Sequence, residues 1–129
     1  MGEMHYLAGS TGAIASEIAN SVTRLYKEFT GRGPTSARAV MDGDLVTVLL
    51  REGLTTGERT LISDGKADLV EQLRREFHAT MRDDLVEAVE VLTERSVIAF
   101  MGAHDLGADI TAHSFVLASD AVPIAAVSA

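Results

Sequence analysis

Apolar residues recur every three or four positions in two long segments of the chain, a spacing typical of amphipathic helices. The first segment predicts a helix over about residues 12–30, with apolar residues at Ile14, Ile18, Val22, Leu25 and Phe29. The second predicts a helix over about residues 66–93, with apolar residues at Leu69, Leu73, Phe77, Met81, Leu85, Ala88 and Leu92. A helix of that length measures roughly 42 Å, which is longer than a domain of this size is wide. We therefore expect the second helix to kink or to project into a partner.

Four shorter segments have the composition or the alternation of β-strands. They are residues 37–41, 45–50, 95–101 and 110–117. Asp42-Gly43 lies between the first two and is a strong signal for a two-residue hairpin turn. Residues 45–50 are β-branched or apolar throughout, so both faces of this strand suit burial. We expect it to be a central strand, or to have its second face covered by another surface.

Two short motifs mark where helices end and begin. Gly31 suits the left-handed conformation that caps a helix, and Pro34, which follows Gly33, prevents the helix from continuing. Thr55 with Glu58 three residues later is a capping box. We therefore expect a positive φ at Gly31 and a short helix that starts after Thr55.

The order of elements is α-β-β-α-α-β-β, which indicates an α+β fold. We expect two antiparallel hairpins to form a sheet that is covered by two long helices and one short helix. The two helix-plus-hairpin units share no convincing residue identity, so the repeat is architectural. The single domain is predicted to span residues 12–118, after an N-terminal extension of residues 1–11 and before a C-terminal tail of residues 119–129.

Composition and charge narrow the classes of function. The 129 residues are 47% apolar and 23% charged, which is typical of one soluble domain. The absence of Cys excludes disulfides, thiol nucleophiles and thiolate metal sites. The net charge of −8 divides into −2 on residues 1–64, with 6 basic and 8 acidic side chains, and −6 on residues 65–129, with 5 and 11. Nucleic acids and anionic membrane surfaces attract basic proteins, so neither is an expected partner.

Direct insertion into a membrane is also not expected, although residues 110–129 are largely apolar. Asp120 lies near the middle of this stretch, where an acidic side chain costs about 3 kcal/mol of insertion free energy. Pro123 and the strand-like alternation up to Leu117 also disfavour a spanning helix. The first residues lack the basic start and long apolar core of a signal peptide. The sequence thus predicts a cytoplasmic protein, peripheral to a membrane only through a partner.

The run Gly31-Arg32-Gly33-Pro34 looks like a phosphate-binding loop, but it follows the end of a helix, whereas anion sites use helix N-termini. The negative dipole end at this position favours the positive charge of Arg32 itself. A cap with a sharp exit into a strand is therefore the favoured interpretation. Arg32 together with Arg38 remains a candidate pocket for a carboxylate-like or bicarbonate-like anion, or for the acidic group of a partner.

The histidines raise the question of a metal site. They are His5, His78, His104 and His113. None forms the pair spaced by four residues on a helix that zinc sites commonly use. If Gly102 opposes Asp109 in the last hairpin, His113 faces Ile98 rather than His104. We therefore predict no metal and no cofactor, although His113 remains a candidate ligand-binding residue.

Catalytic residues are not apparent either. Glu87, Glu90 and Glu94 share one helix face, but they alternate with apolar positions in the manner of a solvated face. The serines lack the Gly-x-Ser-x-Gly motif of a nucleophile elbow. No residue is therefore predicted to be catalytic.

Several short motifs resemble those of one bacterial family. They are the run 25–34 that contains Gly-Arg-Gly-Pro, Ala37-Arg38, Leu54-Thr55-x-x-Glu58 and Phe115-Val116-Leu117. Together they are similar to the C component of the Mps membrane-potential systems, the MpsC family, over about residues 12–118. The chain departs from this family at Thr93-Glu94-Arg95, where a glycine often follows the long helix. The resemblance implies a small soluble protein associated with a membrane system linked to membrane potential and inorganic carbon supply, with no established catalytic residue.

Two functions agree with these observations. The favoured one is a non-enzymatic accessory or regulatory module that binds another protein, such as a subunit of a membrane system, and forms a homodimer. Its support is the lack of a catalytic constellation and the surplus apolar surface of residues 45–50 and 66–93. The alternative is a sensor of small anions, or a simple enzyme, that uses Arg32, Arg38 and His113. Convergence of these three side chains on one cleft would favour the alternative.

Overall fold

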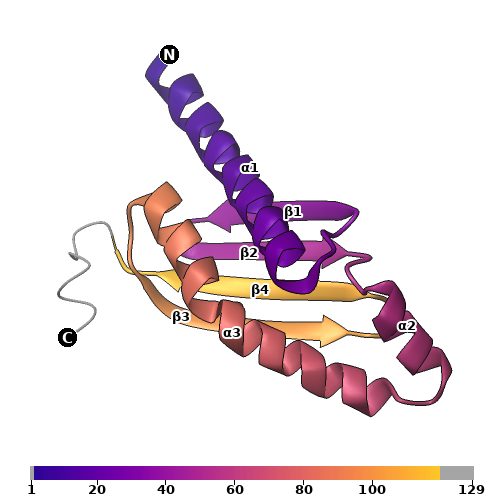
Figure 1. Ribbon diagram of the computed structural model, residues 1–129. Helices are drawn as coiled ribbons and strands as arrows, with labels where there is room; N and C mark the ends of the chain where they lie inside the picture. The colour runs from indigo at the N-terminus through magenta and orange to yellow at the C-terminus, as the bar shows by residue number, and fades with distance from the viewer. Residues whose placement is uncertain (1, 120–129) are drawn as a thin grey trace.

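The computed structural model describes the backbone of residues 2–119 and the side chains of residues 11–119. It has the predicted order of elements and confirms the α+β fold class (Figure 1). The elements are α1 (Gly2–Thr30), β1 (Ser36–Asp42), β2 (Leu45–Arg51), α2 (Thr56–Ser63), α3 (Ala67–Thr93), β3 (Val97–Asp105) and β4 (Ile110–Leu117). Residues 120–129, most of the predicted tail, lie outside the described residues, and the division of the chain at residues 12 and 118 stays a prediction.

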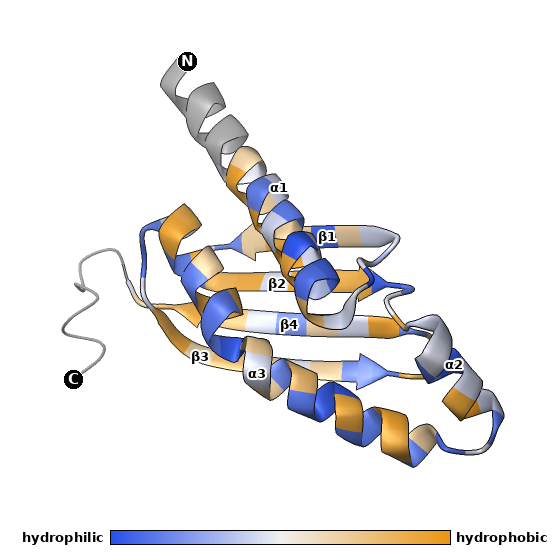
Figure 2. Cartoon of the chain, in the orientation of Figure 1, coloured by the Kyte–Doolittle hydropathy of each residue, from blue (hydrophilic) through white to orange (hydrophobic). Residues whose placement is uncertain are grey.

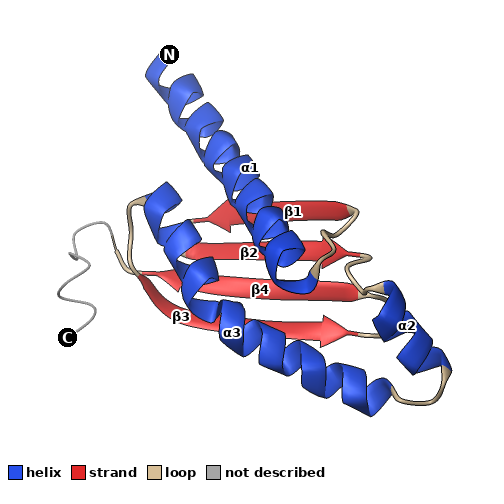
Figure 3. Ribbon diagram, in the orientation of Figure 1, coloured by secondary structure: helices blue, strands red, loops and turns tan. Residues whose placement is uncertain are grey.

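The four strands form one antiparallel sheet in the order β1-β2-β4-β3. Each hairpin contributes one edge strand and one inner strand, so β2 is paired on both sides and the predicted central position of residues 45–50 is confirmed. α1 and α3 lie on the same face of the sheet, here termed the inner face (Figure 3). In the described residues no helix covers the opposite face, here termed the outer face.

The core lies between the inner face and the two long helices. Alternation along the strands places every second side chain of β2 and β4 under the helices. The buried apolar residues of these strands are Val46, Val48, Leu50, Phe115 and Leu117. The helices add one buried stripe each: Ile18, Val22 and Tyr26 from α1, and Met81, Leu85 and Val89 from α3. Figure 2 shows that β2 is apolar along most of its length, which suits its place at the centre of this layer.

α1 begins at Gly2, ten residues before the predicted start at residue 12. The helix therefore passes through Gly12, which the sequence interpretation placed at its beginning. A glycine inside a helix costs about 1 kcal/mol relative to alanine but does not end the helix. The periodic signal used for the prediction starts at Ile14, so it marks where the buried stripe starts rather than where the helix starts.

The predicted apolar stripe of α3 is correct in the second half of the helix and wrong in the first. Met81 is fully buried, whereas Leu69 and Leu73 are 51% and 39% exposed. A repeat of four residues advances about 40° beyond a full helical turn at each step, so a run of such steps leaves the buried face. Val70 and Arg74 are the buried side chains in the first half instead.

The length of α3 serves contacts within the chain. The helix crosses the sheet diagonally, and its first turns reach past β3 and pack against α2 (Figure 1). Its later turns pack against α1 over the sheet. A partner is therefore not needed to explain a helix of 27 residues.

Left-handed residues end both long helices. Gly31 has a φ of 82° and donates its N–H to the carbonyl oxygen of Lys27 at 3.0 Å, which confirms the predicted cap. Glu94 takes the same role after α3, with a φ of 56° and an N–H bond to the carbonyl oxygen of Glu90. A residue with a Cβ is strained in this conformation. Glu94 lies in the segment Thr93-Glu94-Arg95, where the resemblance to the MpsC family leads us to expect a glycine.

We expect opposite effects from substitutions at the two caps. Gly31→Ala should lower the free energy of unfolding by about 1 kcal/mol, because alanine is strained at positive φ. A Cβ at position 31 would meet no atom within 4 Å, so the effect isolates backbone strain. Glu94→Gly should raise the free energy of unfolding by about 0.5–1 kcal/mol for the converse reason. Urea unfolding measures both.

Gly12→Ala is the matched control for these caps. Its Cβ would also meet no atom within 4 Å, but the residue lies inside α1. This substitution should leave stability unchanged or improve it by up to about 1 kcal/mol. An unaltered stability for Gly31→Ala would show that the cap of α1 carries no strain for alanine.

Candidate functional site

The structure places the three predicted binding residues apart. Arg32 follows α1 and donates its Nε–H to the carbonyl oxygen of Glu52 at 3.1 Å. Arg38 lies on β1 opposite Leu49 and is exposed on the outer face. His113 lies on the inner face of β4 and is fully buried. Since Arg38 and His113 are on opposite faces of the sheet, the three do not share one cleft. Their roles in binding stay predictions.

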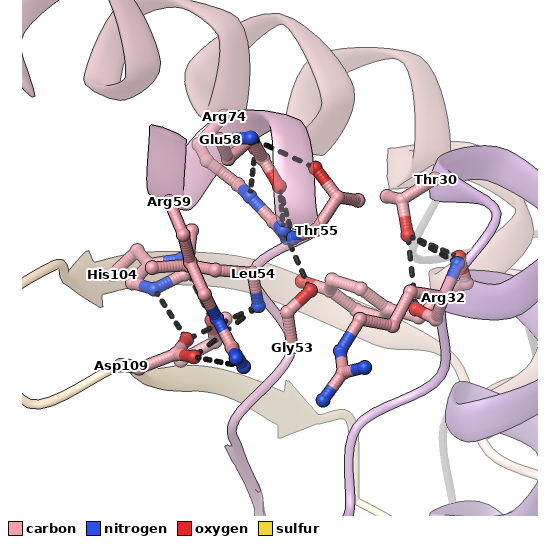
Figure 4. A network of polar contacts seen from close by, with 12 residues as sticks. Thr30, Arg32, Gly53, Leu54, Thr55, Glu58, Arg59, Arg74, His104 and Asp109 are labelled. Carbon is pink, nitrogen blue, oxygen red and sulfur yellow. Dashed lines mark hydrogen bonds and ion pairs between the residues drawn. The ribbon is translucent and has the colours of Figure 1, made fainter. Parts of the chain in front are cut away.

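A buried ion pair joins α2 to α3. Arg74 and Glu58 are 1% and 3% exposed. Arg74 donates from Nε to Glu58 Oε2 at 2.7 Å and from Nη2 to Oε1 at 2.5 Å, a bidentate arrangement (Figure 4). Nη2 also donates to the carbonyl oxygen of Gly53 at 2.8 Å. One guanidinium therefore ties α3 to α2 and to the loop before α2.

Glu58 is also the acidic member of the predicted capping box, which the structure confirms. Its Oε1 accepts the N–H of Thr55 at 2.8 Å, and Thr55 Oγ1 accepts the N–H of Glu58 at 3.1 Å. Burial by itself raises the pKa of Glu58, but hydrogen bonds from Arg74 and Thr55 and the charge of Arg74 outweigh burial and hold that pKa below its usual value. The carboxylate is therefore ionised at neutral pH.

Four rings from four different elements meet in the core beside this pair. Tyr26 Oη on α1 and His113 Nε2 on β4 are hydrogen-bonded at 2.5 Å. The His78 ring on α3 has its centroid 4.9 Å from that of His113 and 6.3 Å from that of Tyr26. Phe100 on β3 stacks on His113 with the centroids 5.3 Å apart. The cluster thus connects both helices to both strands of the second hairpin.

Gly102 makes room for His113. The two residues are opposite each other in the β3–β4 ladder, and a Cβ on Gly102 would lie 2.5 Å from His113 Nδ1. The expectation that Gly102 opposes Asp109 is therefore wrong. β3 continues to Asp105 and the turn spans residues 106–109, whereas the sequence interpretation ended the strand before Gly102. A glycine in this strand marks the close approach of a ring, not the start of a loop.

A cleft of about 300 Å³ opens beside the ion pair, between α3 and β3. Its wall includes Arg74, Arg75 and His78 from α3, and Gly102 and His104 from β3. Three buried nitrogens of these residues have no hydrogen-bond partner within the described part of the chain: Arg74 Nη1, His78 Nε2 and His104 Nε2. Such groups are rare in folded proteins, and these three nitrogens lie beneath the surface that water reaches.

His104 is held from two sides. Its Nδ1 is hydrogen-bonded to Thr111 Oγ1 at 3.0 Å. Its Nε2 lies 3.3 Å from Asp109 Oδ1, close enough for electrostatic attraction but outside hydrogen-bond geometry (Figure 4). Nη1 of Arg74 and Nε2 of His78 are therefore less constrained than Nε2 of His104.

The histidines of this region are neutral at pH 7. Burial lowers the pKa of His78 to about 4, with smaller contributions from His104 and Arg74. Burial, with smaller contributions from the neighbouring His78 and His104, likewise lowers the pKa of His113 to about 3. Burial also raises the pKa of Tyr26, so its phenol stays protonated. Each neutral imidazole then offers one N–H donor and one acceptor without a net charge.

The sequence signal for this site is an interrupted line along α3. Val70, Arg74, His78, Met81 and Leu85 are spaced by four, four, three and four residues. An arginine and a histidine thus occupy positions on the inner side of an otherwise apolar line. A polar residue at a buried position is more informative than an apolar one. The stripe chosen from the sequence began at Leu69 and missed this line.

In the part of the chain that the structure describes, no group of three or more His, Asp or Glu residues is placed to hold a metal ion.

A family model described as "Na+-translocating membrane potential-generating system (MpsC)" matches residues 10–119. The chain belongs to the MpsC family. The uncharacterized protein YbcI of Bacillus subtilis (strain 168) is 29% identical over 92 residues, which cover 70% of this chain and 74% of that protein. No solved structure matches the chain significantly. The resemblance found in the sequence motifs is thus confirmed.

Membership of the MpsC family connects the chain to a membrane-potential system. Within residues 2–119, no helix combines the length and the apolar character required to cross a membrane.

The neutral histidines should make stability depend on pH. His78 and His113 have pKa values of about 4 and about 3 in the folded protein, against an ordinary histidine value of 6.5. As the pH falls below about 6.5, these histidines are therefore protonated in the unfolded chain before they are protonated in the folded protein, so acid favours unfolding. Between about pH 6.5 and about pH 5, each of these histidines should lower the free energy of unfolding by about 1.4 kcal/mol per pH unit. Urea unfolding across this range measures the slope.

His78→Gln is the comparison for this pH dependence. Glutamine does not titrate, so the variant should lose the share of the slope that belongs to His78, whatever its stability at pH 7. A wild-type stability that stays constant across the range would contradict the burial of neutral histidines.

Proposed function

We propose that this MpsC-family protein is a non-enzymatic accessory component of a membrane-potential-generating system and acts by binding proteins. In this proposal it is cytoplasmic, reaches the membrane through a subunit of the system, and forms a homodimer. Family membership supports the connection to such a system. The observation that carries the proposal is the uncovered outer face of the sheet.

The outer face carries large apolar side chains, although nothing in the described residues covers it. Its large exposed apolar side chains include Val40, Leu45 and Met101, which are 44% to 53% exposed. Thr47 and Ser114 lie near its centre and are hydrogen-bonded to each other at 3.0 Å, so these hydroxyls need no outside partner. An antiparallel sheet that faces water normally carries polar residues on that face. Contiguous exposed apolar surface instead favours an interface.

A second copy of the chain fits this face best. Each chain has a net charge of −8, so two copies repel each other unless they meet where charges are few. The outer face meets this requirement in its middle strands, where the outward residues of β4 are Ile110, Ala112, Ser114 and Val116. Two sheets stack face to face about 10 Å apart in known folds. A two-fold pair would use the same patch on both copies.

Light scattering is expected to give twice the 13.7 kDa of one chain at micromolar concentration. Met101→Asp should give a monomer, because an unpaired carboxylate in an apolar interface costs several kcal/mol. Val91→Asp is the matched control, since Val91 is 67% exposed on α3, away from the sheet face, and the substitution adds the same charge. A monomeric wild type, or dissociation by both substitutions, would contradict the proposed interface.

A second surface suits a subunit of the membrane system. A groove of about 530 Å³ lies between α1 and α3. Its lining combines the apolar Leu25, Val91 and Leu92 with one basic residue, Arg24, and four acidic residues, Glu17, Glu28, Asp84 and Glu87. An apolar groove with acidic residues is complementary to a basic amphipathic helix. Such segments are common next to membrane helices on the cytoplasmic side, where Lys and Arg are enriched.

Charge reversal tests the groove. Asp84→Lys combined with Glu87→Lys should weaken binding of the membrane subunit about tenfold or more, which is about 1.4 kcal/mol. Cross-linking in native membranes, followed by quantitative mass spectrometry, measures the subunit captured. Asp68→Lys combined with Glu76→Lys is the control, because both residues are exposed on α3 outside the groove and the change in net charge is the same. Equal losses in the two double variants would show that net charge, not the groove, governs binding.

A further inference from the structure

β3 is an edge strand without the charged residues that normally protect such an edge. Within residues 2–119 it is paired with β4 alone, so its other side presents unpaired N–H and C=O groups. It carries no charged side chain from Val97 to Ala103. A long uncharged edge is a template for a further strand, and natural sheets commonly place charges there to prevent pairing. β1, the opposite edge, follows this rule with Arg38 and Asp42.

The first turns of α3 extend past the edge of β3 (Figure 1). The cleft of about 300 Å³ lies between these turns and the strand. On β3 it is lined by Gly102, which faces the helices opposite His113, and by Ala103, which faces the outer side opposite Ala112. Because residues from both faces line it, the cleft runs along the edge of β3 rather than over one face. It thus lies where a fifth strand would extend the sheet.

Residues 120–129 follow β4 at the end of the sheet where β3 begins. The N–H of Ala118 donates to the carbonyl oxygen of Ser96 at 2.8 Å, so the two chain segments are adjacent there. A chain that continues from Ser119 therefore has only to pass the first residues of β3 to reach its free edge. A segment that turns back at this point runs antiparallel to β4 and hence parallel to β3, since β3 and β4 are antiparallel.

The length and composition of residues 120–129 suit this edge. The free side of β3 is two strand spacings from β4, about 10 Å, a distance that about three residues cross. Seven further residues in a strand span about 23 Å, enough to run from Val97 to Ala103. Asp120, the single charged residue of the segment, falls in the crossing. Pro123 is compatible with an edge strand, where the position of its missing N–H faces solvent.

We propose that residues 120–129 form a fifth strand that pairs with the free edge of β3 in the same chain, parallel to β3 and beneath the first turns of α3. The contacts are main-chain hydrogen bonds, so the segment needs little more than low charge and an extended backbone. The inference is independent of the proposed protein-binding function, because that function uses the outer face of the sheet and the groove between α1 and α3 rather than the edge of β3.

Amide hydrogen exchange of the ¹⁵N-labelled full chain, followed by nuclear magnetic resonance, tests the fifth strand. In an edge strand every second N–H points away from the sheet and exchanges quickly. β1 should show this alternation and is the internal reference. Residues 99–103 of β3 should instead be protected without alternation, because the segment accepts the N–H groups that point away from β4. These amides should exchange at least about tenfold more slowly than the outward amides of β1.

Two proline variants separate strand pairing from other causes of protection. Because Pro123 has no N–H, its position points away from β3, and so does every second position after it, including Ala125. Ala126 then points its N–H at β3. Ala126→Pro should restore fast exchange at the outward amides of residues 99–103, whereas Ala125→Pro, the matched control, should leave them protected.

Fast exchange at these amides in the unaltered chain would overturn the proposal, because the edge of β3 would then be open. Equal exchange in the two proline variants would also overturn it, since pairing in a strand distinguishes alternate positions. Protection that increases with protein concentration would assign the edge to a second copy of the chain and would contradict pairing within one chain.

Discussion

The ion pair between Arg74 and Glu58 fixes the geometry around the candidate cleft. Taking two charges out of water costs several kcal/mol per ion, and the bidentate contact and the additional bonds to Gly53 and Thr55 offset that cost. A buried charge without its partner costs about 3–5 kcal/mol, so neither residue tolerates change alone. Because Glu58 also caps α2, the same carboxylate sets where α2 starts, how α3 is rotated, and which nitrogen of Arg74 remains free.

Local patterns were sufficient to predict the elements of the fold. The turn after Asp42, the cap at Gly31 and the capping box at Thr55 depend on atoms within about four residues of one another, so their signals are complete within short windows of sequence. Two of the three failures share a cause. The start of α1 before Gly12 and the rotation of the first half of α3 are not set by local periodicity, because tertiary packing decides which face of a helix is buried.

The candidate site was not predictable in the same way, because its contacts join distant segments. Arg74 and Glu58 are 16 residues apart, and Tyr26 and His113 are 87 residues apart. Predicting the contact between Tyr26 and His113 requires knowing which residues of β3 and β4 are opposite each other. The prediction from sequence ended β3 before Gly102 and therefore paired the wrong residues. His113 was selected as a candidate ligand-binding residue, and in the structure it makes a buried hydrogen bond with Tyr26 within the ring cluster.

The position of β4 has a consequence for synthesis of the chain. β4 is an inner strand of the sheet, yet it follows every other described element in sequence. Until it emerges from the ribosome, β2 carries a free row of N–H and C=O groups beside apolar side chains, which is a template for pairing with other chains. Translation of the intervening residues 52–109 takes on the order of several seconds. During these seconds the nascent first hairpin is able to pair with other chains and aggregate. Binding by a chaperone, or early packing of α1 on the hairpin, would protect it.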